Sequence, residues 1–133
     1  MHSRLPLHRI LTMTKHKLSS LTTPEQYLKR KHGQLKYQRN KGNPELCWEI
    51  TEDDLIFLWK KQEGRCAVAN LHMNHQGDLN DLKNASLDRV DNGKGYTRKN
   101  IRLVCLSVNK MRGSLTESEF HWWIKQIYIG ELL

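Results

Sequence analysis

The sequence predicts a small α+β domain in which helices flank one short antiparallel hairpin. Its 133 residues are about one domain's length. Two short apolar segments, 85–90 and 101–105, lie on either side of a turn sequence, and helix-start signals occur before and after them. Hydrophobic residues make up 38% and charged ones 27%, as in an ordinary soluble protein, and no apolar run approaches the roughly 18 residues of a membrane span.

Two helices are predicted before the hairpin. In residues 23–26, Thr is an N-cap, Pro occupies the first helical position and Gln follows three residues after the cap. This helix should extend to about Asn40 and end at Gly42-Asn43-Pro44. A second helix should begin after Thr51, with acidic residues in its first turn, and stop at Gly64.

The central segment predicts strand, turn, strand and helix. Asp91-Asn92-Gly93 provides hairpin turn chemistry. We expect the elements in this order: a strand at 65–71, a polar loop at 72–84, strands at 85–90 and 101–105, and a helix at 107–112.

The last helix should complete the core. It opens with a capping box at residues 116–119, and Phe120, Trp123, Ile124 and Ile127 then follow at i, i+3, i+4 and i+7. A hairpin with one short helix, about residues 84–112, cannot bury enough apolar surface alone. We therefore expect the flanking helices, with Trp59 and Trp123, to supply its core.

The net charge of +8 is concentrated in the first third of the chain. Residues 1–44 carry ten basic side chains and one acidic one, a net +9, whereas residues 45–133 carry 12 basic and 13 acidic ones, a net −1. This asymmetry predicts a basic arm and helix at 1–44 that bind polyanions, and a separate domain at 45–133. A solvated tail or a cleaved presequence for an organelle is the alternative, since residues 1–24 contain no acid.

The cysteines favour a reducing compartment, and we expect a cytoplasmic protein. Three cysteines without a CxxC pair argue against a disulfide scaffold and a four-cysteine zinc module. Cys66 and Cys105 lie in predicted strands without mates and should be buried thiols.

Four polar positions stand out in the hairpin unit: Asp88, Arg89, Asn100 and Asn109. The hairpin folds Asp88 back beside the helix that carries Asn109, where a carboxylate and an amide oxygen suit Mg²⁺. Turn and capping roles are the alternative for such residues. Asp88 and Arg89 are adjacent in a strand, so both reach one site only if the strand ends or bulges there.

These residues carry a resemblance to a known family. The segments are WKKQEGRCAV at 59–68, ASLDRVD at 85–91, GYT at 95–97, NIRLVC at 100–105 and VNKMR at 108–112. In order and spacing, over about residues 50–125, they resemble HNH endonucleases of the phage and homing type. The resemblance implies a ββα-metal (His-Me) finger that hydrolyses DNA phosphodiester bonds with one Mg²⁺ or Mn²⁺ and no zinc.

The resemblance also assigns roles. Asp88 and Asn109 would be metal ligands, and Asn100 would hold the hairpin loop. Arg89 departs from the family pattern, which has a His that deprotonates the attacking water. An arginine cannot act as that base but is well shaped to hold a phosphate.

Two explanations for Arg89 remain open. Another group can activate water, namely solvent or one of the candidates His72, His75, His121 and Asp91. Otherwise the chain is a non-catalytic nucleic-acid-binding protein with a degenerate finger.

Basic side chains extend the predicted DNA contacts beyond the four central residues. They lie in the basic helix, in the hairpin loop and beside Asn109: Lys29, Arg30, Lys31, Lys36, Arg39, Lys94, Arg98, Lys99, Lys110 and Arg112. We expect a phage- or mobile-element-encoded monomer that acts on DNA in the host cytoplasm and does not bind membranes.

Overall fold

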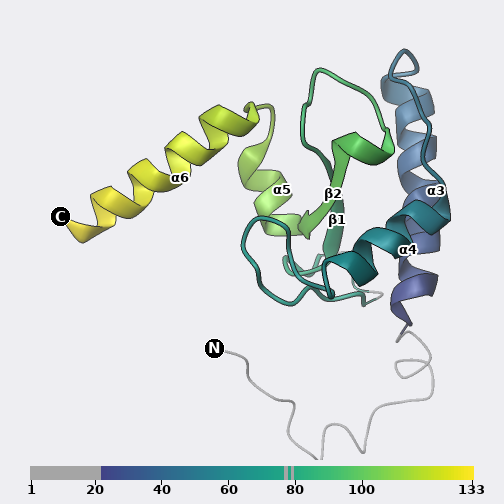
Figure 1. Cartoon of the computed structure of the whole chain (residues 1–133), viewed down its shortest axis with the longest axis horizontal. Coiled ribbons are helices and arrows are strands. Elements are labelled where there is room, and N and C mark those ends of the chain that lie inside the picture. Colours follow the sequence, from purple (N-terminus) through teal and green to yellow (C-terminus); the bar gives the residue numbers. More distant parts are fainter. Residues whose placement is uncertain (1–21, 77, 79) are drawn as a thin grey trace, which may run out of the picture.

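The computed structural model describes residues 22–76, 78 and 80–133 (Figure 1). The fold of this part is α+β, as the sequence predicts. Its elements in chain order are α3 (Pro24–Gly42), α4 (Glu52–Lys61), β1 (Ala85–Arg89), the 3₁₀ turn η1 (Arg98–Asn100), β2 (Ile101–Cys105), α5 (Leu106–Arg112) and α6 (Glu117–Leu132). Most of the basic arm, residues 1–21, lies outside the described residues.

The three predicted Thr N-caps are confirmed, and the fourth predicted helix is α5, which begins at Leu106. Thr23, Thr51 and Thr116 are N-caps, and each forms a reciprocal capping box with the residue three positions later. The helix α3 ends at Gly42, just before Asn43-Pro44.

The sheet is a single antiparallel pair in the predicted place. Its register runs without a bulge from Ala85 opposite Cys105 to Arg89 opposite Ile101, so β1 ends at Arg89. The loop that follows passes close to the 47–49 segment, where Tyr96 N donates to Cys47 O at 2.9 Å. A Cβ on Gly95 would lie 2.6 Å from the Cys47 sulfur, so this close approach requires glycine.

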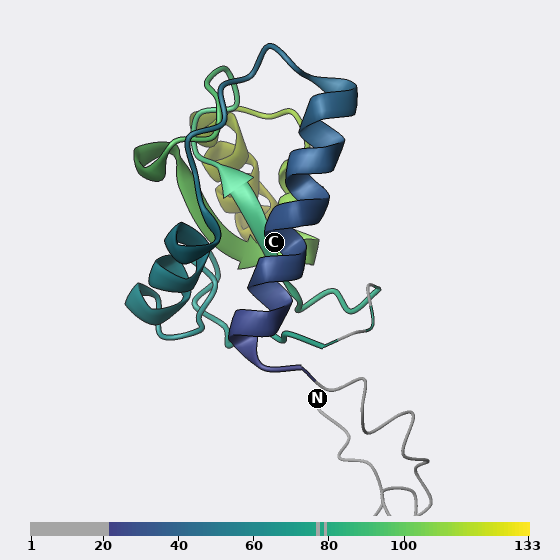
Figure 2. The same ribbon diagram turned by 90° about the vertical axis from the view of Figure 1, so that its right-hand side faces the viewer.

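The sheet lies between α5 on one side and α3 with α4 on the other (Figures 1 and 2). From α3, Tyr27 and Leu28 enter the same core as Leu55, Leu103 and the other buried apolar side chains. The Tyr27 hydroxyl donates to Ala85 O at 2.6 Å, and burial raises the pKa of Tyr27 to about 12. The basic helix is therefore part of the core that the rest of the chain builds and not an arm separate from it.

The strand predicted at 65–71 is wrong. Cys66 N donates to Leu71 O and Asn70 N donates to Cys66 O, so the chain reverses in a turn in which Asn70 has a φ of 58°. The prediction of buried thiols is confirmed for Cys66 and Cys105, and burial raises the pKa of the Cys105 thiol to about 11.

The predicted burial of α6 is also wrong beyond its first turn. Phe120 is 3% exposed, but Trp123 is 49%, Ile124 39% and Ile127 66% exposed. The reason is geometric, because α6 leaves the body after its first turn and projects away from the sheet (Figure 1). Trp59 does pack, half-buried, against the core. In the described part of the chain, no helix has the length and apolar character needed to cross a membrane.

Candidate functional site

Three of the four central residues predicted from the sequence meet in one cavity. It has a volume of about 200 Å³ and lies where β1, the following loop and the end of α5 come together. Arg89 reaches it beside Asp88 because β1 ends there, without the bulge that the sequence left open. The lining residues are Leu35, Leu87, Asp88, Arg89, Asn92, Tyr96, Asn109, Arg112 and Gly113.

Asn100 lies outside this lining and ties the hairpin loop together. Its Oδ1 accepts from Asp91 N at 2.8 Å. Its Nδ2 donates to Asp91 O at 3.0 Å and to Gly95 O at 2.9 Å. The side chain is 7% exposed, so its amide links both ends of the loop from within.

The Asp88 carboxylate belongs to a buried ionic network that the sequence did not reveal. Its Oδ2 accepts from Arg102 Nε at 2.9 Å and from Arg112 at 2.8 Å. Arg102 also holds Glu117 with two hydrogen bonds of 2.8 and 2.6 Å. Two carboxylates and two guanidinium groups thus balance in charge, as buried ions must.

The network shifts the pKa values of its members. Burial opposes the charged form of Glu117, yet hydrogen bonds from Arg102 and His121 lower the pKa of Glu117 below its ordinary value. Burial likewise works against the charged Arg102, but Glu117 and Asp88 raise the pKa of Arg102. Both side chains therefore stay charged at neutral pH.

The prediction that Arg112 contacts DNA is wrong. Arg112 is 2% exposed, and it donates to Arg89 O and Val90 O at 2.6 Å and to Leu115 O at 3.1 Å, besides its pair with Asp88. The last turn of α5 faces the end of β1, so the guanidinium is used inside the protein. Its role is to position the Asp88 carboxylate and the backbone that follows it.

Two oxygen atoms on residues that line the cavity are of the kind that suits a hard cation. Asn109 Nδ2 donates to Ser86 Oγ at 2.8 Å and to Leu87 O at 3.3 Å. Within residues 22–76, 78 and 80–133, neither Asn109 Oδ1 nor Asp88 Oδ1 accepts a hydrogen bond. This donor set fits Mg²⁺, which takes few protein oxygens and completes its shell with water and phosphate. The same residues contain no cluster of three or more His, Cys, Asp or Glu side chains suited to a metal.

The guanidinium group of Arg89 uses some of its N–H groups within the protein and leaves others without a partner among the described residues. One terminal nitrogen donates to Asn92 O at 3.0 Å and to Lys94 O at 2.7 Å, and the guanidinium lies 5.3 Å from the centre of the Tyr96 ring. Its Nε and second terminal nitrogen have no hydrogen-bond partner among the described residues. These N–H groups can therefore bind a phosphate in the cavity.

None of the candidate bases lines the cavity. His75 Nδ1 lies 2.7 Å from Thr22 O, and His121 Nε2 lies 2.7 Å from the Glu117 carboxylate. Asp91 accepts from Gly93 N within the turn, and His72 is exposed elsewhere on the surface. The structure does not bring these side chains to Asp88 and Asn109.

The remaining basic residues divide by environment. Lys29, Arg30 and Lys36 on α3 are exposed, as are Lys94, Lys99 and Lys110. Lys31 and Arg39 are half-buried, and Arg39 donates to Leu46 O at 2.7 Å.

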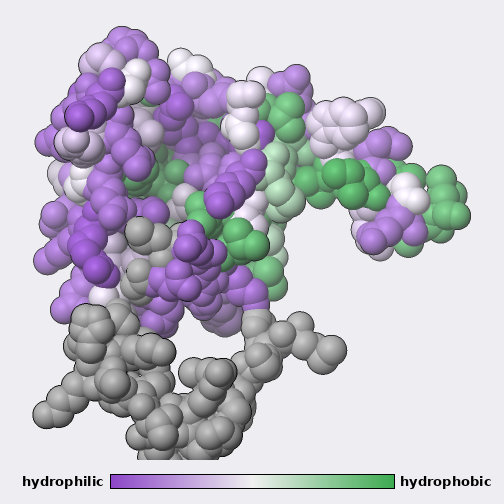
Figure 3. All heavy atoms as spheres, turned by 180° about the vertical axis from the view of Figure 1, so that it is seen from behind, coloured by the Kyte–Doolittle hydropathy of each residue, from purple (hydrophilic) through white to green (hydrophobic). Residues whose placement is uncertain are grey.

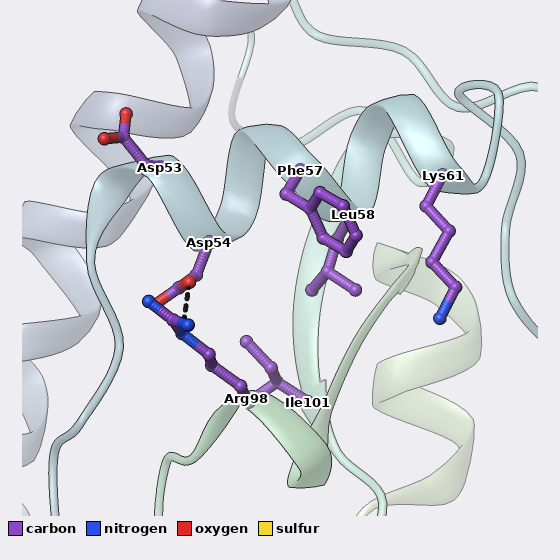
Figure 4. A pocket seen from close by; sticks show the side chains of 7 residues that line it. All are labelled: Asp53, Asp54, Phe57, Leu58, Lys61, Arg98 and Ile101. Carbon is purple, nitrogen blue, oxygen red and sulfur yellow. Dashed lines mark ion pairs between the residues drawn. The ribbon is translucent and has the colours of Figure 1, made fainter.

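Arg98 lies away from the Asp88 cavity. It pairs with Asp54 at 2.8 Å beside a second cavity of about 360 Å³, where Asp53 adds another carboxylate (Figure 4). Its charge is therefore offset by acidic neighbours. The predicted cations that are exposed lie on α3, in the hairpin loop and at Lys110, and Lys94 of the loop lies 3.9 Å from the Asp91 carboxylate.

The sequence interpretation missed Arg102, Glu117 and Tyr96 as parts of the site. A signal for Arg102 was present, because the hairpin register places it directly opposite Asp88. Glu117 and Tyr96 come from a helix start and a loop, and no local pattern predicted that they would face the site.

Comparison with known proteins adds no relative: no family model, curated protein or solved structure matches this chain. The defining feature of the chain is a β-β-α unit whose loop is tied by a buried amide and whose polar side chains surround one cavity.

Proposed function

We propose that this chain is a divalent-metal-dependent DNA endonuclease of the HNH class, with β1, β2 and α5 as its ββα-metal finger. The observation that carries the proposal is the meeting of Asp88 and Asn109, from a strand and a helix, in one cavity with Arg89. Asn100 supports it, since its hydrogen bonds to both ends of the loop keep β1 and the cavity in a fixed relation.

In this mechanism, Asp88 Oδ1 and Asn109 Oδ1 would hold Mg²⁺ or Mn²⁺. A bound ion of this kind stabilises negative charge on the scissile phosphate and on the leaving oxygen. Arg89 binds a phosphate oxygen through its remaining N–H groups. Arg102 and Arg112 hold the opposite oxygen of Asp88, so that its carboxylate keeps one orientation.

The proton of the attacking water leaves to solvent in this proposal. The cavity lining contains no imidazole, and a guanidinium cannot accept a proton at neutral pH. Without a protein base, the cleavage rate should rise with pH and lack the bell shape that an essential acid and base produce.

The test is plasmid cleavage with Mg²⁺ against EDTA. Asp88→Asn keeps the shape and an acceptor for the two arginines but removes the charge that a metal needs. Asn109→Ala removes the second oxygen. We expect each variant to lose more than about 100-fold in rate, the upper end of the effect for groups that only support a ligand. Asp53→Asn, an exposed substitution on α4, is the matched control. Equal residual cutting in all four proteins would overturn the site.

A non-catalytic nucleic-acid-binding protein is the second candidate. It is favoured by the pairing of Asp88 with two arginines and by the hydrogen bonds from Arg89 to backbone carbonyls. Tight binding without cleavage in Mg²⁺ or Mn²⁺ would select it.

Binding itself has a separate test in the exposed cations of α3. Replacing Lys29, Arg30 and Lys36 by Ala should reduce the slope of log affinity against log salt by about 0.9 for each phosphate that these side chains neutralise. A wild-type salt slope in this triple variant would remove α3 from the DNA interface.

A further inference from the structure

The helix α6 exposes an unusual amount of apolar surface. All thirteen residues after Phe120 are exposed. Eight of them are large and apolar, with exposed fractions from 39% upward: Trp122, Trp123, Ile124, Ile127, Tyr128, Ile129, Leu132 and Leu133. Figure 3 shows this hydrophobic surface along the projecting arm, in contrast to the largely hydrophilic side that α3 covers.

The apolar side chains lie on two sides of the helix. At 3.6 residues per turn, Trp123 and Ile127 continue the stripe that Phe120 begins, whereas Ile129 lies on the opposite side. Trp122 lies about 100° from Trp123 around the helix, and its ring contacts the Trp123 ring, with 4.9 Å between the ring centres. A helix with apolar residues all round is ordinarily buried. One shallow groove would cover only one side, so the partner must enclose the arm.

The charge of α6 argues against nucleic acid and anionic lipid as that partner. Glu117, Glu119 and Glu131 outnumber its single lysine, Lys125. Helices that bind a membrane surface carry Lys and Arg on their polar face, and DNA contacts need cations. A protein surface is the partner that this composition fits.

Gly130 indicates what kind of protein surface packs against α6. Glycine inside a helix costs about 1 kcal/mol relative to alanine, yet a Cβ on Gly130 would meet nothing within 4 Å. No contact within the described chain therefore requires a small residue there. Phe120 is used by the core of its own chain, and the exposed residues that follow it on the same stripe, Trp123, Ile127 and Gly130, are spaced by four and three residues. This is the spacing of a helix-pairing seam.

We propose that α6 is a dimerisation helix that pairs antiparallel with α6 of a second copy of this chain. In that register, Trp123 packs over Gly130 of the partner subunit and the same contact recurs by two-fold symmetry, with Ile127 near the axis. The large indole on one helix fills the space that the missing side chain leaves on the other. The opposite side of the arm, with Ile129, then faces the body of the partner subunit.

The available area is sufficient for a stable dimer. Eight large side chains at least a third exposed offer roughly 800 Å² for each copy, which is the size of a standard interface. The dimer takes the place of the monomer expected from the sequence. The dimer proposal does not depend on the proposed nuclease activity, because it is tested by measuring the mass of the particle in solution.

The experiment is sedimentation velocity on the full chain. We expect the wild type at about twice the chain mass of 15.7 kDa and Ile127→Asp at the single-chain mass, with circular dichroism unchanged in fold. Phe57→Asp on α4 is the matched control, since Phe57 is 64% exposed against 66% for Ile127, and it should stay dimeric. A monomeric wild type at its highest soluble concentration, or a dimeric Ile127→Asp, would overturn the proposal.

A second experiment tests the register. In a Cys47→Ser background, Trp123→Cys mixed with Gly130→Cys should form a mixed disulfide in preference to the disulfides of either variant alone. Preferred 123–123 crosslinks would contradict the antiparallel arrangement. Recruitment of a monomeric wild type to phosphatidylserine vesicles would instead assign the arm to a lipid surface.

Discussion

The β1–β2–α5 unit and the helix α6 depart from the usual inside–outside distribution in opposite directions. The first buries Asp88, Asn100 and Arg112, and the second exposes Trp123 and Ile127. Buried polar groups and contiguous exposed apolar ones are the informative exceptions, because scattered apolar residues occur on any surface. One region encloses a cavity lined by polar side chains, and the other leaves apolar side chains exposed in the described part of the chain.

The two regions also differ in how completely their unusual residues are satisfied. In the β1–β2–α5 unit, the buried charges and amides find partners in the strand, the loop and the first turn of α6. On α6, every residue after Phe120 is exposed, and the Trp122 and Trp123 rings contact each other rather than the body of the protein. Substitutions in the β1–β2–α5 unit should therefore lower the stability of the chain strongly. Substitutions of the exposed residues of α6 should leave the stability of a single chain nearly unchanged.

The largest loss of stability is expected when Arg112 is removed from the buried network. Arg112→Met leaves Asp88 and three backbone carbonyls short of a donor, and breaking a buried pair costs about 3–5 kcal/mol in free energy of unfolding. Urea denaturation measures it. Lys110→Met, on the exposed side of the same helix, should change stability by less than about 0.5 kcal/mol. Similar values for the two variants would mean that the network is not structural.

Asn100→Ala should come next, with a loss of about 3 kcal/mol. It removes three hydrogen bonds of roughly 1 kcal/mol each and leaves buried loop groups unpaired. Chemical denaturation against Asn40→Ala, an exposed substitution on α3, provides the comparison. A loss below that of the control would show that the loop holds without its amide.

The ionisation of Tyr27 tests whether α3 packs in the core or belongs to the basic N-terminal arm. Because burial raises the pKa of Tyr27 from 10.0 to about 12, its contribution is complete below pH 10 and is lost as pH rises from 10 to 12. That loss is up to about 3 kcal/mol at 1.36 kcal/mol per pH unit. Tyr27→Phe should flatten this part of the stability–pH curve, measured by denaturation at several pH values. An unchanged alkaline slope would mean that Tyr27 is not buried in solution.

The smallest effect is expected for Glu117, which joins the two regions. Its pKa is lowered below 4.5, so its contribution is present above pH 4.5 and disappears as pH falls through the lowered value. Glu117→Gln should cost about 1–2 kcal/mol at neutral pH and should weaken the acid dependence. This lies below the roughly 1.5–3 kcal/mol of a hydrogen bond to a charged group, because the Glu117 side chain is 31% exposed and solvent screens its charge. Thermal unfolding from neutral to acidic pH follows it. Parallel pH curves for the variant and wild type would contradict this role.

Local chemistry in the sequence determined most of the elements. A Thr cap and its partner three residues later define each helix start. Such signals act within a few residues, so they can be read without the fold. The hairpin lies where the sequence predicts it, but Asn92 and Gly93 have no positive φ, and the strands are joined by the longer loop 90–100. The grouping of Asp88 with Asn109 followed from the same hairpin.

Only the tertiary structure decided where charged and apolar side chains point. Arg112 was predicted to contact DNA, but the packing of α5 on β1 buries it against Asp88. Trp123 has the spacing of a buried residue, but α6 leaves the body before that position can reach the core. An apolar stripe shows that one face of a helix is to be covered, but it does not show which surface covers that face. Burial depends on the placement of elements that are distant in the sequence.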